Sequence, residues 1–140
     1  MTIEKITVAK LLKLEQEKSI ELSEDFFEAL KPEDGQFAVI ILNLNRKSVR
    51  IIPTSTEKIY KVSINIDKLA QDFFQKVSNL FYEMNIKSLY STGLCFVDNK
   101  CVYDLYIDSV EYEKIDEAKL KDNIMKIDGI TTIDIESISV

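Results

Sequence analysis

The amino-acid sequence predicts an α+β protein built from two small modules that meet near residue 55. Its 140 residues suffice for one ordinary domain or two very small ones. Apolar residues alternate in several segments, as they do in strands, and recur at helical spacing in others. A short polar stretch with a proline, residues 53–56, separates two apolar segments and marks a boundary. We therefore expect an N-terminal module over residues 1–55 and a C-terminal module over residues 56–140.

The first module is expected to be small and rich in strands. Ser23 is placed to cap a short helix, because Glu24 and Asp25 in its first turn favour the helix dipole. Residues 45–48 have the composition of a turn between two apolar runs, which predicts a hairpin. The expected order is an extended segment, a strand, a short helix and the two strands of the hairpin, at residues 6–14, 19–22, 24–30, 37–44 and 49–52.

The segment KSIELSEDFFEALKPEDGQFAVIILNLNRKSVRIIP combines a polar cap, an LKPEDGQ turn and a hairpin that ends in proline. It resembles the swapped-hairpin modules of the AbrB/SpoVT type over roughly residues 5–53. The resemblance implies that two chains interlace into one small barrel. The segment departs from the family pattern at Ser23, where proline is usual, and at Phe27 and Glu28, where the DNA binders of the family commonly carry basic residues.

DNA binding by the first module would depend on a few basic side chains near its start. The resemblance assigns these contacts to Lys10, Lys13 and Lys18. The alternative to DNA binding is that the three lysines belong to an ordinary solvent-exposed charged face. The net charge of −6 disfavours attraction of the whole molecule to a phosphate backbone.

The second module is expected to alternate strands and helices. Its elements are a strand, a helix, two strands, a helix and a strand, at residues 60–66, 69–84, 89–97, 101–110, 115–127 and 131–135. Asp67 can cap the first helix, Asn85 can end it, and Gly129 suits the C-terminal cap of the second helix. This βαββαβ order favours a four-stranded antiparallel sheet with both helices on one face, which is the ferredoxin-like arrangement.

A tight turn at Asp98–Asn99 would fix which residues of the central hairpin share a face. A two-residue turn there directs two alternating sets toward the helices: Tyr90, Thr92, Leu94 and Phe96, and Cys101, Tyr103, Leu105 and Ile107. Cys95 then lies on the opposite face from Cys101, so we expect no disulfide between them. The opposite face is partly apolar and is expected to meet a partner subunit or the first module.

The segment YKVSINIDKLAQDFFQKVSNLFYEMNIKSLYSTG, which begins this module, looks like an ACT-type small-molecule regulatory domain, with the Lrp-type effector domain as a near relative. The resemblance implies that an amino acid binds at the loop after the first strand and at an adjoining subunit's strands. This chain would contribute Asp67 and Lys68 from the loop, and Ser91, Thr92 and Gly93 from the second strand. The loop lacks the family's glycine after the aspartate. Asp67 as a helix cap and Gly93 as a close-packing glycine are the alternatives.

Composition excludes several kinds of chemistry. The chain has no histidine and therefore no imidazole base or imidazole metal ligand. Its three glycines are too scattered for a phosphate-binding loop, and two cysteines alone cannot form a four-ligand zinc site. We expect no enzymatic activity, no cofactor and no bound metal. Without a secretory signal or an apolar run of about 18 residues, a soluble cytoplasmic protein is expected.

These features favour a non-catalytic regulatory protein that forms a homodimer or a larger homo-oligomer. In the leading hypothesis, the C-terminal module binds an amino acid or another small metabolite, or mediates assembly. The N-terminal module then responds through its affinity for DNA or protein. The alternatives are a DNA-binding transcription regulator that acts through the first module and a purely structural oligomerisation protein. An enzyme ranks last.

Overall fold

The computed structural model describes residues 7, 9–30, 37–96 and 100–140, and within these ranges the chain has a mixed α+β fold. The helices are α1 (Glu24–Leu30), α2 (Phe73–Glu83), α3 (Ser109–Glu113) and α4 (Glu117–Met125). The strands are β1 (Phe37–Asn43), β2 (Ser48–Thr54), β3 (Lys58–Ile66), β4 (Tyr90–Cys95), β5 (Cys101–Asp108) and β6 (Ile130–Ser139).

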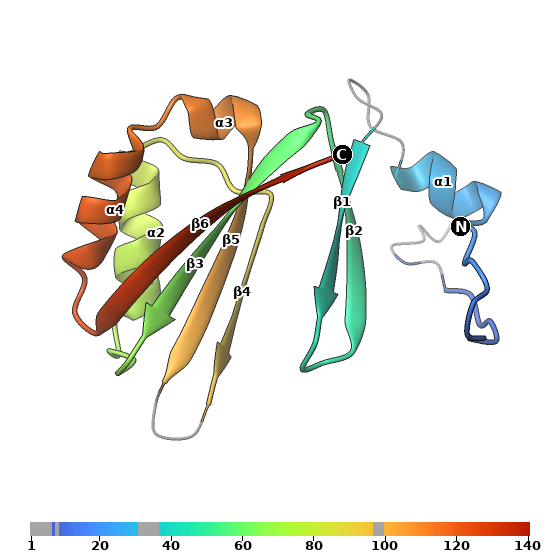
Figure 1. Cartoon of the computed structure of the whole chain (residues 1–140), viewed down its shortest axis with the longest axis horizontal. Coiled ribbons are helices and arrows are strands. Elements are labelled where there is room, and N and C mark those ends of the chain that lie inside the picture. Colours follow the sequence, from blue (N-terminus) through green and yellow to red (C-terminus); the bar gives the residue numbers. More distant parts are fainter. Residues whose placement is uncertain (1–6, 8, 31–36, 97–99) are drawn as a thin grey trace, which may run out of the picture.

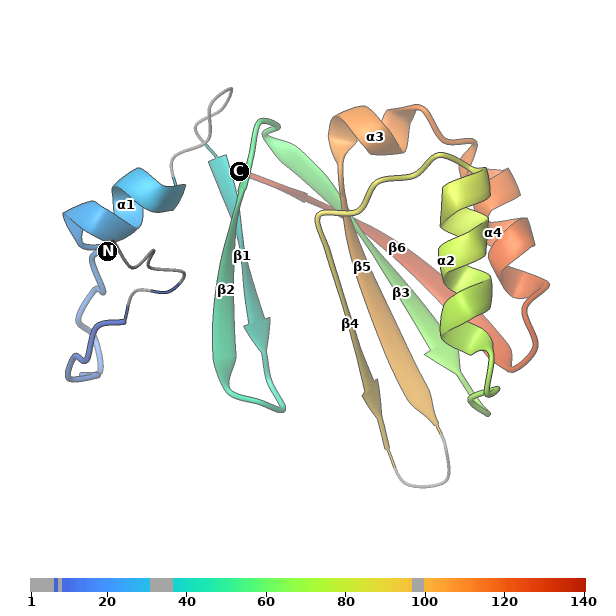
Figure 2. The ribbon, with the colours of Figure 1, turned by 180° about the vertical axis from the view of Figure 1, so that it is seen from behind.

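The strands form two antiparallel sheets. β1 and β2 make a hairpin, and the other four strands are ordered β4-β5-β3-β6. Helices α2 and α4 lie on one side of the four-stranded sheet, and the hairpin lies on the other side (Figure 1). The view from behind shows the same three layers, with α1 beyond the hairpin (Figure 2). The division of the chain at residue 55 stays a prediction.

The main core lies between the four-stranded sheet and its helices. β3 directs Val62 and Ile64 to this side, as its alternation predicts. They are buried against Phe73 of α2 and against Leu120 and Ile124 of α4. Each element thus contributes one apolar face, and removal of these faces from water holds the sheet and helices together.

A second, smaller core joins the hairpin to the opposite face of the sheet. Val39 and Ile41 of β1 form one buried cluster with Ile59 of β3 and Tyr106 of β5. Ile59 and Tyr106 face this way because neighbours along a strand point to opposite faces. The sheet face that was expected to meet a partner subunit or the first module is therefore packed against the hairpin in this region.

The register between β4 and β5 differs by one residue from the predicted one. Cys95 pairs directly with Cys101, and the two form a disulfide, so the expectation of no disulfide is wrong. Phe96 donates its N–H to the carbonyl of Lys100 at 2.7 Å, so five residues, 96–100, separate the two strands. A shift of one residue moves every side chain of a strand to the other face. The predicted two-residue turn itself falls on residues 97–99, outside the described ranges.

The corrected register changes the predicted helix-facing set only on β4. Cys101, Tyr103, Leu105 and Ile107 of β5 belong to the main core or pack against it, as predicted. On β4 the face shared with them carries Ser91, Gly93 and Cys95 in place of Tyr90, Thr92 and Leu94. Tyr90 instead packs against the smaller core beside the hairpin.

Helices α2 and α4 begin later than the sequence predicts. α2 starts at Phe73 with Asp72 at its N-cap, so Asp67 does not cap it. The strand expected to reach residue 110 ends at Asp108, whose carboxylate accepts the N–H of Glu111 at 2.8 Å and begins α3, a helix that was not predicted. Asp116 caps α4 in the same way through the N–H of Lys119. Within the described residues, none of the helices has the length and apolar character needed to cross a bilayer.

Gly129 leads into β6 and does not cap α4, which ends at Met125 with Lys126 as its C-cap. Its φ of 93° lies in the left-handed region, and its carbonyl accepts the N–H of Asp67 at 2.8 Å. A Cβ at this position would overlap the carbonyl oxygen of Lys68. Glycine is therefore required by both the backbone conformation and the close approach of the loop after β3.

The N-terminal segment contains fewer strands than predicted. Residues 19–22 and the described residues before them form no strand, whereas α1 and the hairpin form where expected. Ser23 precedes α1, but its hydroxyl donates to the carboxylate of Asp25 and does not accept a backbone N–H. Most of the predicted LKPEDGQ turn, residues 31–36, lies outside the described residues.

Candidate functional site

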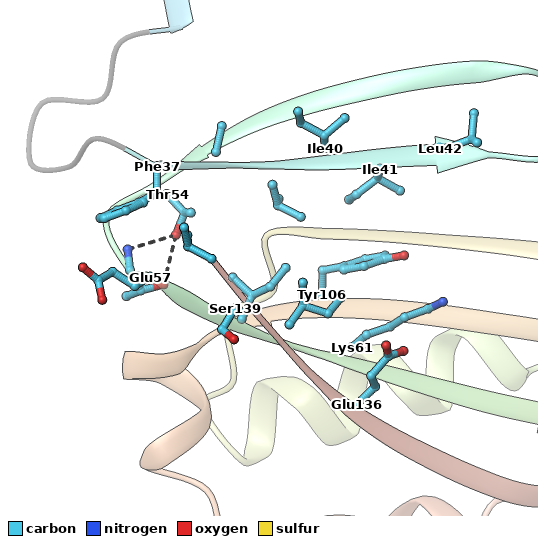
Figure 3. A pocket seen from close by; sticks show the side chains of 16 residues that line it. Phe37, Ile40, Ile41, Leu42, Thr54, Glu57, Lys61, Tyr106, Glu136 and Ser139 are labelled. Carbon is cyan, nitrogen blue, oxygen red and sulfur yellow. Dashed lines mark hydrogen bonds between the residues drawn. The ribbon is translucent and has the colours of Figure 1, made fainter.

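A pocket lies where the hairpin meets the four-stranded sheet (Figure 3). Its volume is about 440 Å³. We call it the junction pocket. Its lining comes from β1, the end of β2, the segment after it, β3, β5 and the end of the chain from β6 onward: residues 37–42, Thr54, Thr56, Glu57, Ile59, Lys61, Tyr106, Glu136 and residues 138–140.

One wall of the junction pocket is the free edge of β1. Six consecutive residues of this strand line it, although their side chains alternate between two faces. This is the pattern expected where a pocket runs along a strand edge, and within the described residues β1 pairs only with β2. The wall therefore offers apolar side chains together with backbone groups that no neighbouring strand uses.

A polar row crosses the floor of the pocket. Lys61 of β3 stands directly opposite Tyr106 of β5 on one side and Glu136 of β6 on the other. The Lys61 ammonium lies 3.7 Å from a carboxylate oxygen of Asp104, whose other oxygen accepts the Ser63 hydroxyl at 2.7 Å. Burial raises the pKa of Tyr106, and the nearby Lys61 charge partly opposes that rise. Tyr106 therefore stays a neutral hydroxyl at ordinary pH, between groups of opposite charge.

The far end of the pocket carries hydroxyl groups. Thr54 is buried, and its hydroxyl lies 3.3 Å from that of Thr56, which in turn donates to the carbonyl of Lys58 at 3.0 Å. The N–H of Val140 donates to the carbonyl of Glu57 at 3.3 Å. This bond ties the end of β6 to the connection between the hairpin and the sheet, so both units shape the rim.

The predicted ligand-binding residues lie outside the junction pocket and form two separate groups. Asp67 and Lys68 follow β3, where the Asp67 carboxylate is 3.9 Å from the Lys100 ammonium. Ser91 of β4 pairs with Leu105 of β5, which pairs in turn with Val62 of β3, five residues before Asp67. At about 3.3 Å per residue, this separates the groups by roughly 16 Å along the strands.

The remaining two predicted ligand residues lie in the middle of β4. Gly93 allows the Tyr103 ring to pack closely on β4, because a Cβ at position 93 would lie only 3.2 Å from Cδ2 of that ring. This agrees with the alternative in which Gly93 serves close packing. Thr92 is opposite Asp104, on the other face of the strand from Gly93. The structure therefore does not bring the five predicted ligand residues together within one chain.

The predicted DNA-binding lysines are exposed, and each has an acidic neighbour. Lys13 and Lys18 lie 3.2 Å and 2.7 Å from the carboxylate of Glu15, and Lys10 lies 3.6 Å from that of Asp25. The Lys18 ammonium, followed by that of Lys13, lowers the pKa of Glu15 below its usual value. These acidic neighbours reduce the positive field at the three lysines. DNA binding through them stays a prediction.

Sequence reasoning missed the junction pocket because it depends on how the hairpin packs onto the sheet. A signal was present in the run FAVIIL, which is apolar on both faces of β1. Continuous apolar runs are typical of strands with contacts on both sides. The polar row could not be predicted from the sequence, because Lys61, Tyr106 and Glu136 come from three distant segments.

The junction pocket is lined by both apolar and charged side chains. Within the described residues, no group of three or more cysteine, aspartate or glutamate side chains gathers to hold a metal ion. The pocket combines apolar walls with one cationic and two anionic side chains, Lys61, Glu57 and Glu136. A scan against protein-family models finds no match for this chain, and neither does a search of curated protein sequences.

Proposed function

We propose that this chain is a non-catalytic regulatory protein in which a small molecule bound at the junction pocket controls the N-terminal module. In this proposal, residues 56–140 form an ACT-like module of the ferredoxin-like type, and residues 1–55 form an AbrB-like module. The strand order β4-β5-β3-β6, with α2 and α4 on the same side, supports the first assignment. Helix α1 followed by the β1–β2 hairpin supports the second.

The observation that carries the proposal is that both units line one pocket. Residues 37–42 come from the hairpin, whereas Lys61, Tyr106 and Glu136 come from the sheet. A molecule in the pocket would contact both and would favour the packing in which they meet. A ligand shifts an equilibrium only by its difference in affinity for the two states, and a site shared by two units supplies that difference.

The charges in the pocket suggest the chemical class of this ligand. Lys61 can donate to a carboxylate, and Glu136 can accept from an ammonium group. The two side chains stand opposite each other on adjacent strands, about 5 Å apart at their Cβ atoms. Ile41 and Ile59 supply the apolar surface nearby. An amino acid with an apolar side chain matches this arrangement.

A thermal-shift screen tests the proposal with amino acids, nucleotides and common metabolites as probes. A ligand that binds only the folded state raises Tm according to its concentration relative to Kd. We expect apolar amino acids to raise Tm, and we expect Lys61→Met to reduce that increase, measured against the variant's own baseline. Lys87→Met is the matched control, because Lys87 is exposed in the connection before β4 and does not line the pocket.

Two outcomes would contradict ligand control at this pocket. One is that none of the probes raises Tm, which would favour the assembly role alone. The other is that a probe raises Tm by the same amount in Lys61→Met as in Lys87→Met, which would place its site elsewhere.

We also propose that the chain is a homodimer whose contact includes the outer face of the hairpin. Val39 and Ile41 face the sheet, whereas Ile40, Leu42 and Val49 point away from it and are more than half exposed. Adjacent apolar side chains on a soluble surface mark an interface, and a two-fold contact between copies requires only a self-complementary patch.

Sedimentation velocity tests this contact. Leu42→Lys should shift the protein from dimer toward monomer, because a lysine ammonium would be buried without a partner in the contact. Leu12→Lys is the matched control, since Leu12 is 53% exposed against 57% for Leu42 and lies outside the hairpin. A wild-type monomer, or equal dissociation in both variants, would contradict the proposed contact.

A further inference from the structure

The disulfide between Cys95 and Cys101 joins an exposed residue to a buried one. Cys101 is 4% exposed and belongs to the main core, whereas Cys95 ends the edge strand β4 and is exposed. We propose that this pair is a reversible thiol–disulfide switch that fastens or frees the turn end of β4. The inference is independent of the junction pocket, because neither cysteine lines it.

Besides the backbone ladder to β5, strand β4 is attached mainly at its two ends. At its start, Tyr90 packs against the smaller core, and the guanidinium carbon of Arg50 lies 5.0 Å from its ring centroid. At its other end is the disulfide. None of the residues of β4 is buried, and Ser91, Gly93 and Leu94 between the two ends are exposed.

Once the disulfide is reduced, few contacts hold the end of β4 that leads into the connection to β5. Within the described residues, what would remain there is the backbone ladder to β5 and the bond from the Phe96 N–H to the Lys100 carbonyl, because β4 lies at the edge of the four-stranded sheet. Strands with few buried apolar contacts open locally at low free-energy cost. The disulfide restricts such opening by closing a ring between residues six apart in the sequence.

The core of the module does not depend on the bond. Val62, Ile64 and Leu105 remain buried under the helices whatever the state of the sulfurs, since their packing comes from other elements. A Cys101 thiol also fits that core as a small apolar side chain. The switch therefore acts on β4 and leaves the rest of the sheet in place.

The chemical step is an exchange with a dithiol reductant. A thiolate of the reductant attacks the sulfur of the exposed Cys95, the bond between the two cysteines breaks, and the Cys101 sulfur leaves as a thiolate that takes up a proton. The second thiolate of the reductant then attacks the mixed disulfide and releases the Cys95 thiolate, which is also protonated. Two electrons and two protons pass to the pair, and the reductant becomes a cyclic disulfide.

Hydrogen exchange measured by mass spectrometry tests the switch on the full chain, with dithiothreitol as the reductant. We expect dithiothreitol to reduce the pair in the folded protein, as shown by alkylation of both thiols when the reductant is removed and the protein is then denatured in the presence of the alkylating reagent. We expect amides at residues 93–96 and 101–103 to exchange roughly tenfold to 50-fold faster afterwards, the upper value being set by the ring-closure entropy. Amides of β3 should keep their rates.

Two variants provide the controls. The double variant Cys95→Ser, Cys101→Ala should exchange like the reduced protein and should not respond to dithiothreitol. Because Cys101 is buried and its replacement leaves a small cavity, the single variant Cys95→Ser, which keeps the buried thiol, is measured beside it.

The proposal is overturned by either of two results. In the first, the bond resists dithiothreitol in the folded chain and is reduced only when urea is added. In the second, the bond is reduced but the exchange rates at residues 93–96 are unchanged, which would make the disulfide irrelevant to the attachment of β4.

Discussion

Gly129 shows how a single residue fixes the approach of two loops. Its left-handed φ and the nearby carbonyl oxygen of Lys68 leave no room for a side chain. We predict that Gly129→Ala lowers the free energy of unfolding by about 2–3 kcal/mol, because it combines backbone strain with a clash against backbone atoms that cannot move cheaply. Urea unfolding followed by circular dichroism measures this loss.

Gly93→Ala is the matched control for Gly129→Ala. The new Cβ would lie 3.2 Å from an edge atom of the Tyr103 ring, and Gly93 has no positive φ. A small rotation of the ring relieves the contact, so we expect a loss below about 1 kcal/mol. Equal losses in the two variants would show that the left-handed conformation is not what makes Gly129 necessary.

Tyr112 gives a pH-dependent prediction at the residue scale. Its ring is stacked on that of Tyr60 with 3.8 Å between centroids, and burial, together with the nearby Glu117 carboxylate, raises the pKa of Tyr112 to about 12. An unfolded tyrosine ionises near pH ~10. Between these two pKa values only the unfolded state loses the proton, so the stabilising contribution present below pH ~10 declines as the pH rises toward 12.

The expected result is that wild type loses about 1 kcal/mol more stability than Tyr112→Phe when the pH is raised from about 8 to about 11. At the lower pH the variant should be about as stable as wild type, because the buried phenol oxygen lies near the Glu117 carboxylate but makes no hydrogen bond of standard geometry within the described residues. Urea unfolding at the two pH values measures both effects. The same pH dependence in both proteins would contradict the role assigned to Tyr112.

The identities of Cys95 and Cys101 alone were insufficient to predict their burial and their pairing. Cys101 was correctly expected to be buried, but Cys95 is exposed and the two are bonded. The faces of β4 depend on whether the connection to β5 has an odd or an even number of residues. Asp98 and Asn99 indicate a turn but do not set its length. One residue of difference reversed the assignment of a whole strand.

At the scale of elements, the docking of the hairpin depends on the sheet-facing side of β1. Ile41 is 7% exposed and packs with Ile59 and Tyr106. We predict that Ile41→Ala lowers the free energy of unfolding by about 2–4 kcal/mol through lost burial and an unfilled cavity. Ile20→Ala, the same substitution at a residue 58% exposed before α1, should change it by less than about 0.5 kcal/mol.

Urea unfolding of the two isoleucine variants, monitored by circular dichroism, measures the difference. A loss for Ile41→Ala as small as that for Ile20→Ala would mean that the hairpin is only loosely attached to the sheet. In that case the junction pocket would not couple the two units.

Elements with strong internal periodicity were predictable from the sequence. Val62, Ile64 and Ile66 of β3 are all buried, and Leu120 and Ile124 define α4, as expected. These elements follow from local pattern, because burial on one face leaves a period in the sequence. The ends of helices and strands were predicted less well, because the hydrogen bond of a single side chain can decide where an element begins or ends.

Helix α3 and the N-terminal segment illustrate the two kinds of failure. α3 begins at a cap on Asp108 that has meaning only once β5 is known to end there. Residues 19–22 alternate like a strand but have no strand partner within the described residues. Alternation predicts a strand only where a neighbouring strand is present to complete its hydrogen bonds.

At the scale of the whole molecule, the four-stranded sheet was predictable and the candidate site was not. The βαββαβ order led to the four-stranded sheet with helices on one side. The junction pocket arises only when the hairpin packs on the other side, and this brings residues 37–42 next to Lys61 and Glu136. Contacts between segments so far apart leave no periodic signal in the sequence.

The central claim is that the packing of the hairpin on the four-stranded sheet couples the two units. Hydrogen exchange measured at increasing urea concentrations gives the free energy of opening for each group of amides. We predict that the amides of β1 open at a lower free energy than those of β3, because ligand control requires a state in which the hairpin leaves the sheet, and that Ile41→Ala lowers the value for β1 further. A free energy of opening for β1 that is unchanged in Ile41→Ala would contradict this claim and remove the basis for ligand control through the junction pocket.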